Sequence, residues 1–412
     1  MFGGMELKKQ LGIMVFILTF VLVFCQTVSA SNLPVNPEHS IQSVIDNTSD
    51  NGTGIVHDKK INLQAKISKT TKKTTKKTTK IANSTIEGIS ISSTGNKGNS
   101  DSSSSSVSGD GRYVVFISYA DNLVANDTNG CADVFVRDLL LNTTERISIS
   151  GTGEEADGDS YMPFISSDGR YVVFVSSADN LVANDTNECV DAFVYDQVSG
   201  TTQRASVSST GEQADFSWWC CASISGNGRY VVFTSSATNL VDGVIGDENV
   251  YVRDMVLNTT EYVGVSGLGN YFPSISADGR YVAFVSKYGR WNTYVVYDRL
   301  LDTTVEIARL KHDDEGIGTA GCTSISADGR YIVFNARPGI IFGNGDFTWH
   351  VFVYDRETQT IQSVDNYDEG ESAESSGPII SADGNYIVFS SYMNDVIPDD
   401  ISGDLDVFVW SR

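Results

Sequence analysis

One phrase of about a dozen residues recurs six times along this chain, and this repetition constrains the fold more than any other feature. Four copies are nearly identical to SISADGRYVAFVS, and two are weaker. The Asp or Asn residues of successive copies are separated by 58, 59, 51, 50 and 55 residues. A regular period of this size predicts a repeat architecture. The copies begin at Val107, Ile165, Ile224, Ser274, Ile325 and Ile380.

Each period predicts four antiparallel strands. The first strand is short (SIS), and the Asp-Gly or Asn-Gly pair after it favours a tight hairpin. The second strand (RYVAFVS) is apolar at almost every position, so both of its faces should be covered. The third strand, such as VFVRD at 134–138, leads through a polar turn to a fourth, such as ERISIS at 145–150. Stacking such sheets around an axis covers both faces, which predicts an all-β, six-bladed β-propeller.

The last repeat predicts how the ring closes. It ends at residues 406–412, after its third strand, and its fourth strand is missing. Near the other end of the chain, STIEGISIS at 84–92 matches NTTERISIS at 142–150 position for position. We therefore expect an N-terminal strand to complete the last blade.

The repeated phrases resemble the TolB-like, WD40-like family of β-propeller repeats. The matching motifs are a S-x-D-G-[RK]-x-[IV]-x-[FY] hairpin and a following [IV]-[FYW]-[VL]-x-[DN] strand, and the resemblance covers residues 85–412. It implies an exported propeller. Family members that carry an additional α/β or hydrolase domain need more chain than the 54 residues at 31–84 supply.

Charge divides the chain into two parts. Residues 1–84 contain eleven Lys and Arg against five Asp and Glu, whereas residues 85–412 contain eighteen against forty-seven. A body with a net charge of −29 argues against nucleic acid as a partner, because phosphate binding requires the opposite sign. It suits an exposed protein that binds divalent cations.

The N-terminal part predicts export. Lys8 and Lys9 precede an apolar run at 11–25 and a small-residue stretch ending at Ala30, which is typical of a signal peptide. The alternative is an uncleaved anchor, and we expect a membrane contact only through that segment. Residues 31–84 form a Lys/Thr-rich stalk with no apolar face, which predicts disorder. We expect the protein outside the cytoplasm, secreted or bound to the cell surface.

Seven Asn-x-Ser/Thr sites could carry glycans in an exported chain. The same Asn-Thr pairs are also ordinary turn residues. The sites are Asn47, Asn51, Asn83, Asn126, Asn142, Asn184 and Asn258.

Long, irregular loops at one end of the propeller predict a binding surface. The hairpins between first and second strands are short and uniform, whereas the other set of loops is long and rich in aromatic residues. These side chains either stack on sugar rings or anchor a protein, or they plug the end of the ring. The candidate ligand-binding residues are Trp218, Trp219, Tyr271, Phe272, Trp291 and Trp349.

Three acidic loops predict calcium sites. Their phrases NDTNGCAD, NDTNECVD and DDISGDLD place oxygen ligands two residues apart, with a carboxylate four residues further on. The alternative is Asp and Asn acting as turn residues. The candidate ligands are Asp127, Asn129, Asp133, Asp185, Asn187, Asp191, Asp400 and Asp406.

No catalytic motif is evident, and we assign no catalytic residue. His312, beside two aspartates, is the best single acid–base candidate, although a solvated loop histidine is the better explanation. We expect a non-enzymatic scaffold for a surface protein or a glycan, with calcium as the candidate cofactor. The alternative is an extracellular polysaccharide lyase or hydrolase with its site at the loop-rich end of the channel.

Overall fold

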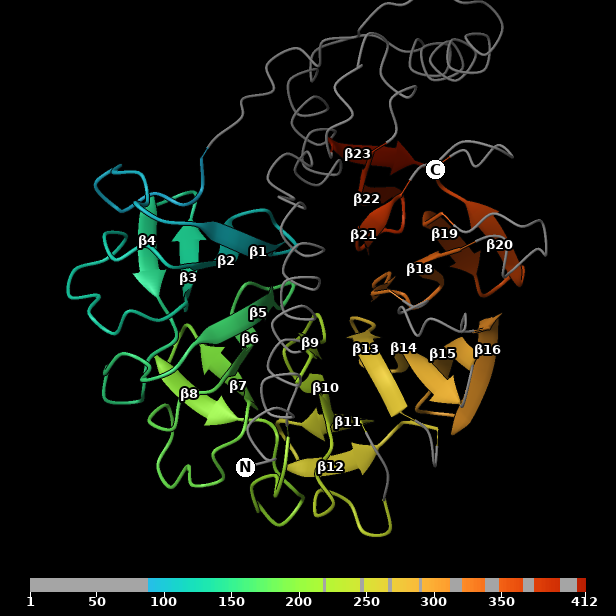
Figure 1. Ribbon diagram of the computed structural model, residues 1–412, viewed down its shortest axis with the longest axis horizontal. Coiled ribbons are helices and arrows are strands. Elements are labelled where there is room, and N and C mark those ends of the chain that lie inside the picture. The colour runs from blue at the N-terminus through green and yellow to red at the C-terminus, as the bar shows by residue number, and fades with distance from the viewer. Residues whose placement is uncertain are drawn as a thin grey trace, which may run out of the picture. The chain divides into compact units, whose positions relative to one another are not determined.

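The structure is a computed structural model, and it shows six β-sheets arranged as the blades of a propeller (Figure 1). The all-β class and the six-bladed propeller predicted from the repeats are confirmed. No helix long and apolar enough to cross a membrane occurs in the part of the chain that is described. That part comprises residues 88–217, 220–244, 248–265, 269–288, 291–311, 321–337, 348–365, 374–392 and 406–412.

Five of the sheets contain four strands in simple sequence order, and every pairing is antiparallel. Blade 6 shows three strands among the described residues. The strands of blades 1 to 3 are β1 (Ser102–Val107), β2 (Tyr113–Ser118), β3 (Asp133–Asp138), β4 (Thr143–Arg146), β5 (Ser160–Ile165), β6 (Tyr171–Ser176), β7 (Asp191–Asp196), β8 (Thr201–Arg204), β9 (Ala222–Ile224), β10 (Tyr230–Ser235), β11 (Asn249–Asp254) and β12 (Thr259–Tyr262). Those of blades 4 to 6 are β13 (Gly269–Ile275), β14 (Tyr281–Tyr288), β15 (Trp291–Asp298), β16 (Thr303–Lys311), β17 (Thr323–Ile325), β18 (Tyr331–Ala336), β19 (His350–Asp355), β20 (Thr360–Ser363), β21 (Ser376–Ile380), β22 (Tyr386–Ser391) and β23 (Asp406–Ser411).

The repeated phrase builds the hairpin between the first and second strands of each blade. In blade 1, Ser108 Oγ and the backbone N–H of Arg112 both donate to Asp110 Oδ1. The Arg112 guanidinium then reaches Asp138 at the end of the third strand and donates from two nitrogens. Such a two-point contact fixes geometry as well as charge. The Ser, Asp and Arg of the phrase therefore tie three strands of one blade together.

The Gly and Tyr of the phrase join one blade to the next. Gly228 has a φ of +70°, and a Cβ placed there would lie 2.0 Å from the ring of Tyr171 in the preceding blade. Gly279 makes the same approach to Tyr230. Only glycine combines this backbone conformation with so close a contact. The glycine at this position is therefore required by the joint between blades.

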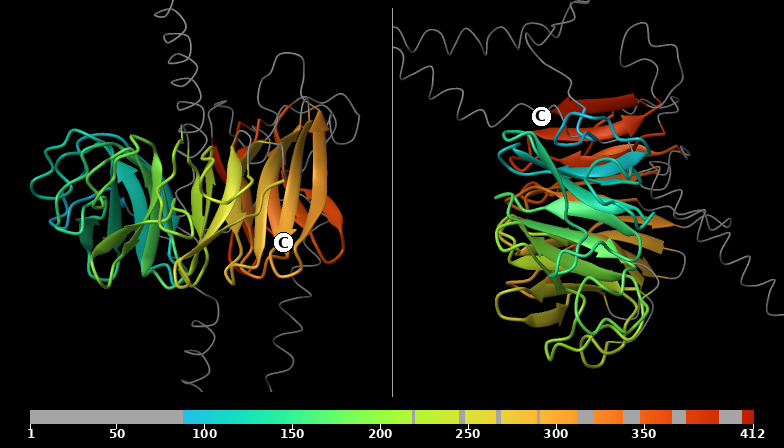
Figure 2. Two further views of the ribbon diagram at one scale, coloured as in Figure 1. Left: turned by 90° about the horizontal axis from the view of Figure 1, so that it is seen from below. Right: turned by 90° about the vertical axis from the view of Figure 1, so that its left-hand side faces the viewer.

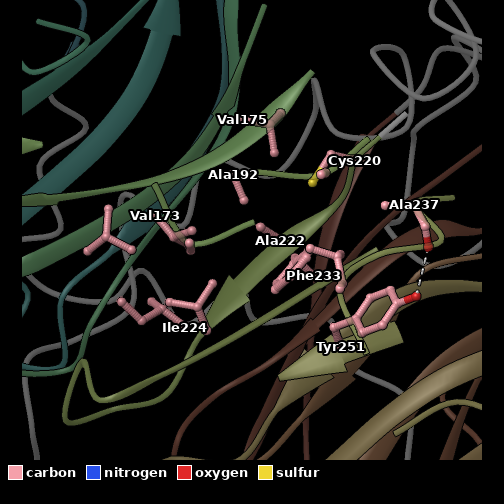
Figure 3. Close-up of a cluster of buried hydrophobic side chains, with 14 residues drawn as sticks. Val173, Val175, Ala192, Cys220, Ala222, Ile224, Phe233, Ala237 and Tyr251 are labelled. Carbon is pink, nitrogen blue, oxygen red and sulfur yellow. Dashed lines mark hydrogen bonds between the residues drawn. The ribbon is translucent and has the colours of Figure 1, made fainter. Parts of the chain in front are cut away.

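Apolar side chains from facing sheets fill the spaces between blades. Figure 3 shows the cluster between blades 2 and 3, in which Val173 and Val175 of β6 face Phe233 of β10. Tyr251 is fully buried there, and its hydroxyl donates to Ala237 O at 3.2 Å. Cys220 belongs to the same cluster, as expected for a small buried hydrophobe.

The segment that begins at residue 88 repeats a connection seen between other blades. Ile89 packs on the blade 1 rings of Phe116 and Phe135, and Thr144 Oγ1 donates to Ile91 O. Between blades 1 and 2, Thr202 Oγ1 donates in the same way to Ile149 O. Residues 84–87 of the predicted closing strand lie outside the described residues, so closure by that strand stays a prediction.

Blade 6 shows where such a strand would lie. Val407 and Val409 of β23 are 45% and 56% exposed, whereas the equivalent Val134 and Val136 of blade 1 are 0% and 4% exposed. Among the described residues, β23 is the outermost strand of its sheet.

Deleting residues 84–92 is expected to lower the melting temperature by several degrees. The deletion removes the contact of Ile89 with the blade 1 rings, and one buried Ile side chain contributes about 1.5–3 kcal/mol. It also leaves β23 as an open edge, which favours aggregation. Thermal unfolding and light scattering would test this, with deletion of the stalk residues 31–80 as the control. An unchanged melting midpoint without aggregation would contradict closure by this strand.

Two glycine substitutions separate backbone strain from contact between blades. Gly211 and Gly228 both have positive φ, at +87° and +70°, but Gly211 faces open space. We expect Gly211→Ala to destabilise the protein by about 1 kcal/mol, from strain alone. Gly228→Ala adds the clash with Tyr171, and we expect a loss of roughly 3 kcal/mol or more. Equal losses in urea unfolding would show that the Gly–Tyr contact is unimportant.

Candidate functional site

The meander order of the strands gives each blade two different ends (Figure 2). Hairpins from first to second and from third to fourth strands lie at one end, which we call the turn face. Loops from second to third strands and connections between blades lie at the other end, which we call the loop face. The candidate ligand-binding and calcium residues of the sequence analysis belong mainly to the loop face.

The structure brings together only part of the predicted aromatic set. Tyr271 and Phe272 of β13 are partly buried, with ring centroids 6.4 Å apart. Trp291 is 36% exposed, and the Arg309 guanidinium lies 4.9 Å from its ring centroid. Trp349 is 7% exposed and belongs to the core. The remaining two candidates, Trp218 and Trp219, lie outside the described residues.

An arginine stands among the predicted calcium ligands of blade 1. Arg146 NH1 lies 3.0 Å from Asp127, 3.2 Å from Asp133 and 3.0 Å from Glu155. Asn129 turns its amide nitrogen, not its oxygen, toward Asp133 at 3.0 Å. The carboxylates of this loop therefore face a guanidinium that supplies the positive charge.

Blade 2 repeats this arrangement. Arg204 NH1 lies 2.9 Å from Asp185 and 3.1 Å from Asp191, and Asn187 donates to Asp191. Asp400 lies outside the described residues, and the side chain of Asp406 is not described. Within the described parts of the chain, no group of three or more His, Cys, Asp or Glu side chains is placed to hold a metal ion. Calcium binding stays a prediction.

Burial changes the protonation of these clusters. It raises the pKa of Asp127 and of Asp185 to about 6, against the lowering effect of the arginines. Burial also raises the pKa of Asp133 and of Asp191. The folded state thus holds protons between about pH 4 and 6 that the unfolded chain has released. Stability contributed by Asp127 and Asp185 therefore falls as the pH rises through this window.

A second cluster lies at the loop face, between the end of β2 in blade 1 and the start of β5 in blade 2. Tyr161 of β5 donates its hydroxyl to Asp159 at 2.7 Å, and burial is the main cause that raises its pKa. Asp159 also accepts from the backbone N–H of Ala132 at 2.7 Å. Tyr119 follows β2, contacts the Tyr161 hydroxyl and is 46% exposed. The result is an exposed aromatic ring beside a fixed hydroxyl and a fixed carboxylate.

The sequence analysis missed this cluster, although a signal was present. Tyr119 occupies the position after the second strand, where blades 2 and 3 have Ser177 and Ser236. Blade 6 has Tyr392 at the aligned position, so an exposed tyrosine occurs there in two of the six blades and is better explained by binding than by folding. The signal was missed because Tyr119 lies in a loop without other aromatic residues.

Blade 5 contains the one described histidine network. His350 Nδ1 lies 3.1 Å from Asp365 Oδ2, and His350 Nε2 lies 2.8 Å from Thr348 Oγ1. His350 and Asp365 are 1% and 4% exposed. In blade 1, Asp133 and Ser148 occupy the same two positions and share a hydrogen bond. The network therefore also ties strands together, and His312 lies outside the described residues.

A hollow lies on the turn face. A pocket of about 180 Å³ lies between blades 2 and 3. It is lined by Tyr171, Val194, Asp196, Thr201, Gln203, Asn227, Gly228, Arg229, Met255 and Val256. Several of these are residues of the repeated phrase, which already have structural roles.

Removing the buried guanidinium of blade 2 tests the electrostatic account. Arg204→Met leaves Asp185 and Asp191 without their cation, and we expect a loss of about 3–5 kcal/mol at pH 7. The loss should shrink at pH 5, because carboxylates with a raised pKa then bind protons. Arg170→Met, which removes an exposed ion pair, is the control and should cost much less. Urea unfolding at both pH values measures these changes, and a pH-independent loss would contradict the account.

No family model and no curated protein matches this chain. Solved structures with similarity include TolB from Acinetobacter baumannii, with 17% identity and a TM-score of 0.42 over 64% of this chain and 54% of that one. An oligogalacturonate lyase in complex with manganese has 14% sequence identity and a TM-score of 0.49, and the match covers 77% of this chain and 78% of that one. The β-propeller domain of the Trilobed protease from Pyrococcus furiosus has 11% sequence identity and a TM-score of 0.47, and the match covers 74% of this chain and 81% of that one. The chain spans about half the length of the Acinetobacter protein. We therefore argue function from this chain's own residues.

Proposed function

We propose that this protein is an exported, cell-surface scaffold that binds a glycan at its loop face. The observation that carries this proposal is the half-exposed ring of Tyr119 beside the Tyr161–Asp159 pair. The broader expectation from the sequence, a protein- or glycan-binding propeller, includes this function.

The chemistry of the cluster favours a sugar. The apolar face of a pyranose packs on an exposed aromatic ring, and its hydroxyls bond to fixed donors and acceptors. Tyr161 and Asp159 hold one another in place, so little ordering is needed when a ligand binds. Nearby hydroxyls are also fixed in pairs, Ser102 with Ser118 and Ser160 with Ser176.

Electrostatics narrows the ligand class. The body carries a net charge of −29, and Asp159 adds a carboxylate to the cluster. A polyanionic glycan would be repelled, so we propose a neutral or cationic one. The predicted leader at 1–30 and stalk at 31–84 support a location outside the cytoplasm, where such glycans are found.

One observation favours an enzyme as a second candidate. Thr348, His350 and Asp365 are joined in the order hydroxyl, imidazole, carboxylate, which is the order that activates a hydroxyl nucleophile. This arrangement would suit an extracellular hydrolase. The deep burial of His350 makes us prefer the binding function.

Two substitutions of Tyr119 test glycan binding on an array of neutral, amino and acidic glycans. Tyr119→Phe keeps the ring and should retain most binding. Tyr119→Ser restores the residue that blades 2 and 3 carry and should weaken binding on the order of tenfold or more, from lost stacking. Neither should change the melting temperature by much, because the side chain is half exposed. Equal binding by the Ser variant, or no glycan bound by the wild type, would contradict the proposal. Release of sugar fragments, abolished by Thr348→Val, would instead support the hydrolase.

A further inference from the structure

In the described part of the chain, the most exposed apolar side chains are all found in one kind of turn. Among the described residues, seven large apolar side chains are more than 60% exposed, and each lies between a third and a fourth strand on the turn face. We call them the apolar tips. They are Leu140 (69%), Leu141 (63%), Val198 (75%), Val256 (67%), Leu257 (63%), Leu300 (72%) and Leu301 (62%).

The turn itself does not require apolar residues. In blade 1, Asp138 Oδ1 accepts the backbone N–H groups of Leu140 and Leu141 at 2.8 and 3.0 Å, and Asn142 supplies the positive φ. Blade 5 builds the corresponding turn from polar residues: Asp355 accepts the N–H of Glu357, and Gln359 supplies the positive φ. The tips of blades 1 to 4 therefore carry apolar surface that folding does not explain.

The tips are held rigidly. The aspartate that caps each turn accepts hydrogen bonds from the arginine of the first hairpin in the same blade, as in the pairs Arg229–Asp254 and Arg280–Asp298. The same Asp298 accepts the N–H of Leu300 and of Leu301. Because the backbone is fixed before any partner arrives, little conformational entropy is lost on docking.

The arginines of the turn face are paired beside the tips. The side chains of Arg112, Arg170, Arg229 and Arg280 are 33–43% exposed, and each pairs with an aspartate. The acidic clusters around Arg146 and Arg204 lie on the loop face instead. A partner that approaches the tips therefore meets no unpaired arginine, whereas carboxylates such as Asp110 and Asp302, which accept hydrogen bonds but pair with no cation among the described residues, lie at the same end.

We propose that the apolar tips dock on the surface of a zwitterionic phospholipid bilayer. The tips form separate islands, one or two residues on each of four successive blades, and all project from the same end of the sheets. A flat, deformable apolar interior beneath a headgroup layer can receive all of them at once. Docking in this way would point the loop face, with its glycan site, away from the membrane.

The tether strengthens this inference. Residues 31–84 lie outside the described residues, and their sequence lacks any apolar period; if they form a random coil, its root-mean-square reach is roughly 40 Å. If the apolar run at 11–25 remains as an anchor, weak docking by the tips is sufficient, because the local concentration of bilayer is high.

Hydrogen–deuterium exchange of the full chain with phosphatidylcholine vesicles tests the proposal. Exchange should slow at turns 138–143, 254–259 and 298–303, and the polar turn at 355–360 should not change. Binding of vesicles through the N-terminal segment alone would not be expected to slow exchange at the three apolar turns and leave the polar turn unchanged. Uniform exchange at all four turns would overturn the proposal.

Substitutions then test the side chains. Replacing the six residues Leu140, Leu141, Val256, Leu257, Leu300 and Leu301 by Thr should abolish the slowed exchange and reduce vesicle partitioning on the order of tenfold or more. The melting temperature and glycan binding should not change, because these side chains are exposed and far along the blades from the loop face. If the sixfold variant fails to fold, Leu300→Thr with Leu301→Thr alone should remove the protection at its own turn only.

The polar turn of blade 5 allows the opposite substitution, in which apolar residues are introduced. Glu357→Leu with Thr358→Leu gives blade 5 an apolar tip, and we expect stronger partitioning and newly slowed exchange at 355–360. Size-exclusion with light scattering identifies the alternative occupant. A wild-type dimer that the sixfold Thr variant converts to monomer, without vesicles, would overturn the lipid proposal in favour of self-association.

Discussion

The contact of the hairpin glycine with the tyrosine of the preceding blade, present at five of the six hairpins, is the constraint on which the rest of the structure depends. A propeller has no single core, so it is only as strong as the joints between its blades. Here the joint is a ring packed against a bare Cα, as in Gly228 on Tyr171, with no space for a single methyl group. A second guanidinium covers several of these rings, such as Arg356 over Tyr281 at 3.7 Å. The tyrosine is thus held from both sides.

This constraint explains why the phrase is repeated while the loops are not. Within the phrase, Ser and Asp close the hairpin, Arg ties the third strand, and Gly and Tyr form the joint. None of these residues is left free to recognise a ligand. Most variation lies outside the phrase, as at the position of Tyr119, where blades 2 and 3 have serine and blade 6 has Tyr392. Function on such a frame is best sought where a blade differs from its neighbours.

The two ends of the blades have taken different physical roles. The loop face gathers carboxylates, and where they converge a buried arginine neutralises them, as Arg146 does for Asp127 and Asp133. The turn face has paired arginines and exposed aliphatic side chains. A protein with acidic, polar residues on one face and exposed apolar tips on the other is suited to the interface between a surface and solvent. We infer that the protein works with one face toward a surface and the other toward solvent.

The sequence by itself determined the repeat, the number of blades and the strand order, because these follow from local periodicity and turn residues. It also located where carboxylates converge, since Asp127 and Asp133 lie in one loop. Only the tertiary structure decided which cation meets them. Arg146 belongs to the far strand of the blade, and no spacing rule places its guanidinium between two aspartates. The sequence could mark Tyr119 by itself, but only the tertiary structure brought it to Tyr161 and Asp159, because these residues belong to two blades whose approach depends on the packing of whole sheets.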